Sequence, residues 1–249
     1  MGLFRDITST YTGFESWFYD RTVAGSVSAS QAHLVDSLLA DVAIGGSVLD
    51  VGCGGGHLAL AIAERGDDVS VVGVDLSEDQ VARATRRAAN VRDRVRFEVA
   101  SALNLPFADD SFSTVVSVGS IKHWPDRRRG MAEMVRVLRP GGRLTVLEID
   151  RGCTFEAAQD FVARMNAPRI ARGPLLWHFR TYVAGQGVEL DEARAMVRDL
   201  ALREVSVSRI AQDPTLLITG RKTPHLPAAA ATADRSVPTG GPIADGVKS

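Results

Sequence analysis

The chain is poor in cysteine and in lysine, and these shortages limit what it can be. Its 249 residues include two cysteines, Cys53 and Cys153. Two cysteines about a hundred residues apart cannot form a disulfide framework or a zinc cluster, so no metal and a reducing, cytoplasmic setting are expected. Only three basic residues are lysines, and Lys122 is the only one within the predicted folded body, since Lys222 and Lys248 lie at or beyond its end.

Two further features are missing, an excess of one charge and a long apolar run. The 29 Lys and Arg residues balance 30 Asp and Glu residues. A balanced chain has no general attraction for polyphosphates, which argues against a nucleic-acid partner. No apolar run approaches the ~20 residues of a membrane span, and the N-terminus lacks a signal-peptide pattern. The 45% of hydrophobic residues is enough for a globular core.

The order of the apolar runs predicts an α/β fold with a Rossmann-like open sheet. Five short, nearly continuous runs are typical of strands buried on both faces: Ser47–Val51, Val69–Val74, Val95–Val99, Phe112–Val118 and Arg143–Ile149. Helical stretches lie between them at Leu58–Arg65, Glu78–Ala89 and Asp126–Leu138. The last two runs, Leu202–Ile210 and Thr215–Gly220, are too close for a helical crossover. The sheet is therefore mostly parallel, with a C-terminal antiparallel hairpin.

The two ends of the chain differ from this central domain of residues 45–222. Residues 1–44 are expected to be helical and rich in aromatic residues, Tyr19 among them. They form either a helix packed on the sheet edge or a lid over a ligand, and the two are compatible. Residues 223–249 consist mainly of Pro, Ala, Thr and Gly with few large apolar residues, so we expect a disordered tail.

A glycine-rich loop with two acidic neighbours is the most informative feature. The first strand runs into Gly52, Gly54 and Gly56, and a helix follows at once. Such a loop alone is shared by many nucleoside binders. Asp50, two residues before the first glycine, would repel a pyrophosphate but suits a cationic amino group. Asp75 ends the next strand, where a carboxylate can bind both hydroxyls of a ribose. A ligand with a ribose, no phosphate and a cationic amino-acid end is implied. S-adenosylmethionine meets that description and NAD does not.

The chain resembles the class I S-adenosylmethionine-dependent methyltransferases in this loop and in four later motifs, over roughly residues 45–150. The motifs, in order, are Gly73–Ser77, Ala102–Phe112, Ser117–Asp126 and Glu133–Arg143. The resemblance implies the family's seven-stranded fold. It is closest to the branch of quinone-biosynthesis and natural-product methyltransferases.

The resemblance also implies a set of cofactor contacts. Asp50 and the loop residues Gly52, Cys53, Gly54 and Gly56 would line the methionine end. The ribose would be held by Asp75. The adenine side and the rest of the cofactor site would be formed by Leu76, Ser101, Ala102, Leu103 and Val118. Many relatives carry Asp in place of Ser101, so adenine recognition here is expected to depend more on backbone and packing.

Simpler explanations exist for each of these residues taken alone. Asp50 could cap the adjacent helix, and Asp75 could lie next to a helix N-cap. His57 is expected to be a residue of the helix start rather than a catalyst. Cys53 is expected to be a small packing residue, because a catalytic thiolate needs a basic neighbour.

The loop after the fourth strand, Gly119–Asp126, should face the transferable methyl group, since ligands lie beyond the carboxyl ends of the strands. His123 is the preferred base for an acceptor that must lose a proton, with a structural role before Pro125 as the alternative. Trp124 is either a pocket wall or a packing residue. Lys122 could orient an anionic acceptor or lower the pKa of the imidazole, and a solvated surface position is the alternative.

An aromatic stretch at Leu175–Tyr182 is the second candidate wall for the acceptor. It lies in a segment near 151–200 that members of the family commonly use for substrate recognition. Trp177 and Tyr182 are candidate substrate contacts there, and His178 is the second candidate base. Core packing is the alternative for all three.

The acceptor is expected to be a small molecule that accepts a methyl group on C, O or N. The chain lacks the Asn/Asp-Pro-Pro-aromatic stretch that enzymes acting on nucleic-acid amines usually carry after the fourth strand. The alternatives are a cofactor-binding protein of the same fold without catalysis, a protein or nucleic-acid methyltransferase, and a nicotinamide-dependent oxidoreductase. The expected assembly is a monomer or a homodimer.

Overall fold

The computed structural model of the chain describes residues 34–42, 45–66, 68–165 and 167–224. Most of the predicted N-terminal lid, including Tyr19, and nearly all of the predicted tail lie outside these residues. Within the described ranges, no helix is long and apolar enough to cross a membrane.

The described elements alternate between strands and helices. A helix over residues 34–41 comes first. It is followed by β1 (Ser47–Val51), α3 (His57–Arg65), β2 (Ser70–Asp75), α4 (Glu78–Arg87), β3 (Val95–Val99), β4 (Phe112–Val118), the 3₁₀ turn η2 (Ile121–His123), α5 (Arg127–Val137), β5 (Leu138–Ile149), α6 (Phe155–Arg164), α7 (Arg172–His178), α8 (Leu190–Val197), β6 (Leu202–Arg209) and β7 (Thr215–Lys222). Shorter 3₁₀ and π segments lie between them at Ala88–Asn90, Arg169–Ala171, Phe179–Val183 and Ala184–Gln186.

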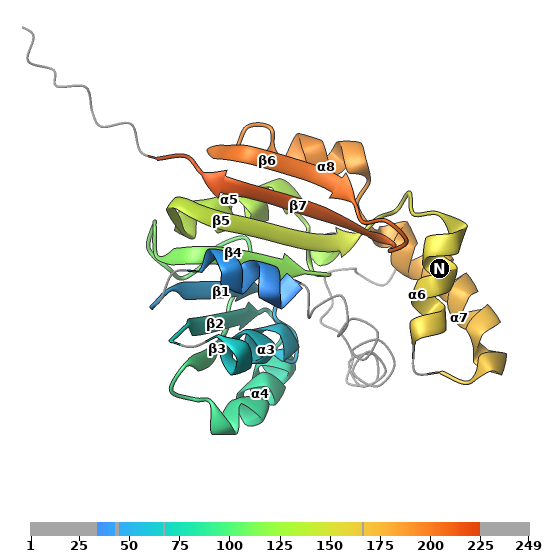
Figure 1. Cartoon of the computed structure of the whole chain (residues 1–249), viewed down its shortest axis with the longest axis horizontal. Helices are drawn as coiled ribbons and strands as arrows, with labels where there is room; N and C mark the ends of the chain where they lie inside the picture. The colour runs from blue at the N-terminus through green and yellow to red at the C-terminus, as the bar shows by residue number, and fades with distance from the viewer. Residues whose placement is uncertain (1–33, 43–44, 67, 166, 225–249) are drawn as a thin grey trace, which may run out of the picture.

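The strands form one seven-stranded sheet in the order β3-β2-β1-β4-β5-β7-β6 (Figure 1). The first five strands pair in parallel, and β7 runs antiparallel to both β5 and β6. This confirms the predicted α/β sheet and its C-terminal antiparallel hairpin. The carboxyl ends of the five parallel strands therefore meet at one edge of the sheet, where the glycine loop also lies.

The predicted strands agree closely with the structure except at the start of β5. That strand begins at Leu138 rather than Arg143 and includes the Pro-Gly-Gly sequence. The register with β4 shifts there, because Phe112 pairs with Leu138 while Thr114 pairs with Arg143. Gly141, in the left-handed region with φ of 77°, allows this irregularity. The Pro-Gly-Gly residues thus form a bulge within β5 instead of lying before the strand.

Helices cover both faces of the sheet, as a parallel sheet requires. On one face the helix of residues 34–41 and α3 pack over alternate strand residues such as Val48 and Val71. On the other face α5 and α8 pack over the intervening residues, such as Leu49 and Val72. Because alternate side chains along a strand point to opposite faces, the continuous apolar runs fill both cores.

The segment near 151–200 contains two different parts. Its last helix, α8, contributes Ala193, Met196 and Val197 to the main core. The earlier helices α6 and α7 enclose a small core of their own around Phe161 and Phe179, whose rings lie 5.0 Å apart. Figure 1 shows this helical pair beyond the end of the sheet toward which β5 points. It is therefore on the side of the carboxyl ends of the parallel strands.

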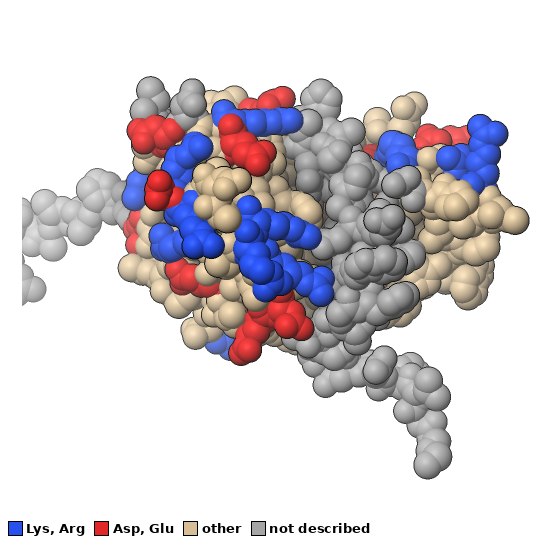
Figure 2. Space-filling model, turned by 90° about the horizontal axis from the view of Figure 1, so that it is seen from below, with Lys and Arg blue, Asp and Glu red and all other residues tan. Residues whose placement is uncertain are grey.

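Arginine side chains gather on the face that carries α4 and β3, with acidic side chains at its margin (Figure 2). Three arginines in or beside α4 and β3 are engaged within the fold. Arg87 donates to the carbonyl of Gly55 at 2.7 Å, Arg94 to that of Gly66 at 2.7 Å, and Arg96 pairs with Glu98 at 2.8 Å. Arg87 and Arg94 thus brace loops of the domain, whereas Arg96 pairs within β3.

Candidate active site

The glycine loop brings open backbone to the carboxyl end of β1. Gly52, Gly54 and Gly56 all have positive φ, between 50° and 80°. The N–H groups of Gly52 and Cys53 both donate to the carbonyl of Val74, which ties the loop to β2. A Cβ on Gly52 would lie 1.9 Å from the hydroxyl of Ser120, whereas one on Gly54 would meet nothing within 4 Å. Glycine at 52 is thus required by close approach, and Gly54 borders open space.

Asp50 and Asp75 lie on neighbouring strands beside this loop. Asp75 accepts hydrogen bonds from the N–H of Gly54 and of Ser77, each at 2.9 Å, so it fixes the loop and the start of α4. Asp50 is only 2% exposed, and its Oδ2 is a buried atom without a hydrogen-bond partner. Burial, and secondarily the charge of Asp75, raises the pKa of Asp50 to about 7. The site therefore holds a buried carboxyl that is ready to receive a donor.

Cys53, inside the loop, is a neutral thiol. Burial raises its pKa well above the usual value, and the nearby Asp50 and Asp75 raise it further. A group that stays protonated is a poor nucleophile. This agrees with the expectation that Cys53 does not act as a catalytic thiolate.

The residues expected to face the adenine lie at the ends of β2 and β3. Leu76, one of these residues, is 60% exposed, and Val99, which was not among them, is 49% exposed. Such exposure is unusual for large apolar side chains. Asp75 of β2 pairs in register with Val99 of β3. Leu76, which follows Asp75, and Val99 therefore lie at neighbouring strand ends. Ser101 is partly engaged locally, since its hydroxyl accepts a hydrogen bond from the N–H of Leu103 at 3.2 Å. Ala102 and Leu103 are half-buried beside it.

The turn after β4 carries Lys122, and its ammonium faces inward. The Nζ lies 3.2 Å from Oε1 of Glu148 and also donates to the carbonyl of Gly119. The Lys122 side chain is 9% exposed. The alternative of a solvated surface lysine is therefore wrong, because the neighbouring strand β5 supplies a buried carboxylate that neutralises the charge.

His123 is half-buried next to this pair. Burial lowers its pKa to about 4, and the charge of Lys122 lowers it further than that of Glu148 raises it. The direction of this effect agrees with the expected influence of Lys122 on the imidazole. The imidazole is neutral near pH 7, where it can accept or donate a hydrogen bond. Because its conjugate acid is strong, it is a weak base toward an acceptor of high pKa.

Trp124 is anchored from two sides. Its indole N–H donates to the hydroxyl of Ser120 at 3.0 Å. Its ring covers Gly130, where a Cβ would approach to 2.3 Å. Val118, at the end of β4, is partly buried and packs against the core cluster of Val48 and Val71. These contacts fit the packing alternative for Trp124, and Trp124 also lines the cavity described below, so it has both expected features.

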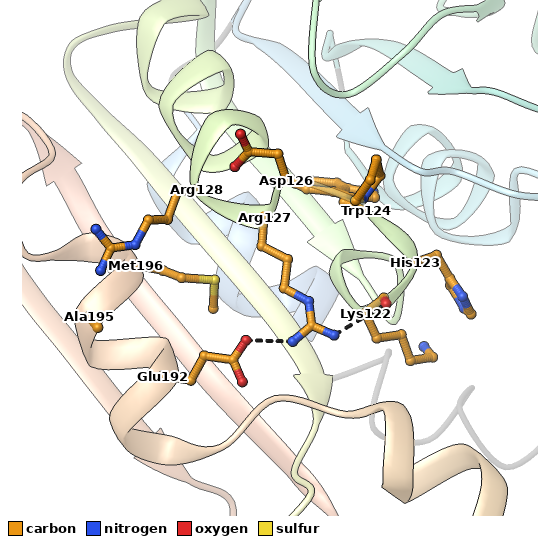
Figure 3. Close-up of a pocket in the computed structure, with 10 residues that line it drawn as sticks. Lys122, His123, Trp124, Asp126, Arg127, Arg128, Glu192, Ala195 and Met196 are labelled. Carbon is orange, nitrogen blue, oxygen red and sulfur yellow. Dashed lines mark hydrogen bonds and ion pairs between the residues drawn. The ribbon is translucent and has the colours of Figure 1, made fainter. Parts of the chain in front are cut away.

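A cavity of about 710 Å³ borders this turn on the side of α8. It is lined by Lys122, His123, Trp124, Pro125, Asp126, Arg127, Arg128, Glu192, Ala195 and Met196. Figure 3 shows Arg127 reaching toward Glu192 and toward the backbone of Lys122. The distances are 2.5 Å to the Glu192 carboxylate and 3.3 Å to the Lys122 carbonyl. Arg127 thus links the turn to α8, and its ion pair with Glu192 forms part of the cavity wall.

The predicted aromatic wall lies elsewhere, on α7 and the π-helical segment after it. Trp177 is 70% exposed and Tyr182 is 56% exposed, and neither lines this cavity. His178 stacks on Tyr182 with ring centroids 5.3 Å apart. The core-packing alternative is therefore wrong for Trp177 and Tyr182, because α7 turns that face outward.

Three site residues were not anticipated from the sequence. Ser120 is packed between the glycine loop and Trp124, and Arg127 clamps the turn onto α8. Glu148 is buried in β5 and accepts from the turn. A charged residue within the apolar run of β5 is the one signal that the sequence offered for Glu148. Within the described residues, no three His, Cys, Asp or Glu side chains gather as metal ligands.

Comparison with known proteins agrees with this geometry. The sequence profile of the family described as "Methyltransferase domain" matches residues 48–142. The 27-O-demethylrifamycin SV methyltransferase of Amycolatopsis mediterranei is 37% identical over 173 residues, which are 68% of this chain and 58% of that protein. The ubiquinone/menaquinone biosynthesis C-methyltransferase UbiE of Geobacter sulfurreducens is 43% identical over 143 residues, 55% of each chain. The chain thus spans little more than half the length of these relatives.

The fold is also shared by a solved protein named for different chemistry. The [4+2]-cyclase SpnF superposes with a TM-score of 0.53 at 20% identity, over 77% of this chain and 81% of that chain. Its likeness concerns the fold alone. The matched family, the sequence relatives and the strand order together show that this chain belongs to the class I S-adenosylmethionine-dependent methyltransferases.

Proposed function

We propose that the chain binds S-adenosylmethionine at the carboxyl ends of β1, β2 and β3 and transfers its methyl group to a small molecule. The observation that carries this proposal is the Asp50 carboxyl, which is buried with one oxygen lacking a partner. A buried polar atom of this kind costs free energy unless a ligand satisfies it. The cationic amino group of S-adenosylmethionine would do so.

The other residues of the site fit the rest of this cofactor. Asp75 is held by two backbone N–H groups and keeps lone pairs for the hydroxyls of a ribose. Leu76 and Val99 offer exposed apolar surface where the adenine ring would pack. The open space at Gly54 lets ligand atoms approach the backbone. We assign these residues, with Gly52, Cys53, Gly56, Ser101, Ala102, Leu103 and Val118, to the cofactor site.

The cofactor, when bound, supplies an activated methyl group on a sulfonium. The contribution of the protein is then largely to hold the acceptor in line and to exclude water. His123 is placed to accept or donate one hydrogen bond as a neutral imidazole. Its low pKa favours an acceptor that ionises easily or already has a free electron pair. His178 remains the second candidate base, and Trp124, Trp177 and Tyr182 remain candidate acceptor contacts, whereas the Lys122 ammonium is engaged by Glu148.

A small-molecule acceptor is supported by the names of the relatives, one a rifamycin methyltransferase and the other a quinone C-methyltransferase. These two differ in the kind of acceptor, so the atom that receives the methyl group stays open among C, O and N. The exposed aromatic residues of α7 offer a surface on which a flat acceptor could stack.

Two measurements test the proposal. Titration calorimetry should show S-adenosylmethionine binding and no binding of NADH, and the opposite result would establish an oxidoreductase. Incubation of cell extract with S-adenosylmethionine labelled in its methyl group should then produce a labelled small molecule. Label in protein or nucleic acid instead would overturn the acceptor class. Binding without any labelled product would favour the alternative of a non-catalytic cofactor-binding protein.

A further inference from the structure

Glu148 is the most deeply buried carboxylate near the turn after β4. Its side chain is 1% exposed, on the interior strand β5. Oε2 accepts from the backbone N–H of Lys122 at 3.0 Å, and Oε1 accepts from the N–H of Ile149 at 2.7 Å. Oε1 also pairs with the Lys122 ammonium at 3.2 Å. One carboxylate therefore binds both the backbone and the side chain of a single turn residue.

These contacts are part of a connected set of interactions that holds the turn. The Lys122 ammonium, while paired to Glu148, also donates to the carbonyl of Gly119 at the start of the turn. Gly119 has φ of 63°, and its N–H donates to the carbonyl of Leu147 on β5 at 2.8 Å. Both ends of the turn are thus fastened to β5, with His123 directly after the fastened residue.

We propose that Glu148 and Lys122 are a positioning pair, which fastens the turn to β5 and so holds His123 half-buried at the acceptor side. Neither residue touches the acceptor in this role. Because the ammonium is neutralised by Glu148, Lys122 is not available to pair with an anionic acceptor. The proposal refines the proposed function. It rests on that function only for the statement that this side of the site faces the methyl acceptor.

The charges that face His123 come from three elements. Lys122 lies on the same turn, Glu148 on β5 and Arg127 on α5, where Arg127 is itself paired with Glu192 of α8. Burial lowers the pKa of the imidazole most, and the two cations lower it while Glu148 raises it. Loss of the Glu148 charge without any movement would therefore lower this pKa. Release of the turn to solvent would instead raise it toward the ordinary value of about 6.5.

This difference in sign gives a decisive experiment. Histidine ring signals are followed by NMR between pH 5 and 8 in the full chain, with His123 assigned by the His123→Gln variant. In the wild type the His123 ring should not titrate in this range. In Glu148→Gln the unpaired ammonium is costly to keep buried, so the turn should detach and His123 should titrate with a midpoint near 6.5. A His123 ring that still does not titrate in Glu148→Gln would overturn the proposal.

A double variant keeps the test open if Glu148→Gln fails to fold. Lys122→Met/Glu148→Gln replaces the pair by neutral side chains of similar size, so no buried charge is left alone. Because the ion pair that fastens the turn is absent, its turn should still detach and its His123 ring should titrate near 6.5. A His123 ring that does not titrate above pH 5 in the double variant would show that the pairing of the two charges is not what holds the turn.

A matched control uses the other buried lysine of the described residues. Lys222 is also 9% exposed and pairs with Asp110 at 2.7 Å, away from this turn. Asp110→Asn should leave the His123 ring without titration, and a titrating ring would show that His123 responds to general loosening. Calorimetry with S-adenosylmethionine on each variant reports separately on the proposed function. If a variant keeps its affinity for S-adenosylmethionine while the titration of His123 changes, the effect lies at the turn. If the wild type does not bind S-adenosylmethionine, that result bears on the proposed function alone.

Discussion

Cofactor binding should depend steeply on pH, because Asp50 must lose a proton to receive a cationic amino group. In the ligand-free protein burial raises the pKa of Asp50 to about 7. A protonated carboxyl offers no charge to the ligand and has one oxygen occupied by hydrogen. We therefore expect S-adenosylmethionine to bind the ionised form and to release a proton on binding below pH 7.

The magnitude follows from the fraction of Asp50 that is ionised. With a pKa of about 7, about half of the protein is competent at pH 7 and about a tenth at pH 6. The apparent Kd should therefore rise about fivefold from pH 7 to pH 6, and nearly tenfold for the next unit. Asp50→Asn cannot ionise, so its binding should be weaker than that of the wild type at pH 7.5 and nearly independent of pH.

Titration calorimetry between pH 5.5 and 7.5 provides the assay. The upper bound avoids the ionisation of the ligand's own α-amino group, expected near 7.7 to 8. Buffers of different ionisation enthalpy report the released proton directly. Asp109→Asn, at an exposed carboxylate, should keep the wild-type pH dependence. Equal affinities at pH 6 and 7.5 in the wild type, with no proton released, would refute the role given to Asp50.

The same group should make the ligand-free protein less stable as pH rises. The folded-state pKa is raised above the unfolded value of 3.8. Its stabilising contribution is therefore complete below about pH 3.8 and is lost as pH rises through about 7. Between pH 5 and 7 the loss should be about 2 kcal/mol. Urea unfolding of wild type and Asp50→Asn at both pH values should show this as a difference between the two proteins, and parallel curves would contradict it.

Three further substitutions test other parts of the site. Asp75→Ala should weaken S-adenosylmethionine binding by about 30- to 100-fold in calorimetry, because two backbone N–H groups and the ribose lose their acceptor; Asp109→Ala is the control, and unchanged affinity would remove the ribose assignment. Gly52→Ala should lower the free energy of unfolding by about 2 to 4 kcal/mol in urea, since its φ is 75° and its Cβ would meet the Ser120 hydroxyl. Adding Ser120→Gly should recover part of that loss, and full stability of the single variant would contradict the close approach. Trp177→Ala, at a side chain 70% exposed, should change stability by less than about 0.5 kcal/mol while slowing methyl transfer to the acceptor; unchanged transfer would exclude Trp177 from the acceptor site.

The architecture and the proposed cofactor side of the site were accessible from the sequence because their signals are local. Each buried strand is a continuous apolar run, and the short link between the last two strands forces an antiparallel pair. The spacing of Asp50 and Asp75 around the glycines places both carboxylates at one sheet edge once the strands are parallel. Their geometry therefore follows from chain-local pattern and one rule of topology.

The proposed acceptor side required the tertiary structure, because its contacts join residues far apart in the chain. Lys122 meets Glu148 across 26 positions, and Arg127 meets Glu192 across 65. From the sequence Lys122 could equally be a solvated lysine, since nothing local states which carboxylate faces it.

What the sequence predicts and what the tertiary structure adds differ most for buried ionisable side chains. The sequence by itself determined the fold class, the glycine loop and the two carboxylates that flank it. Only the packed structure decided that Asp50 is a buried carboxyl with an elevated pKa, that Lys122 points inward and that His123 is neutral. A side chain's charge state depends on how completely neighbours exclude water and on which charges they bring, and both are set by packing across strands rather than along the chain.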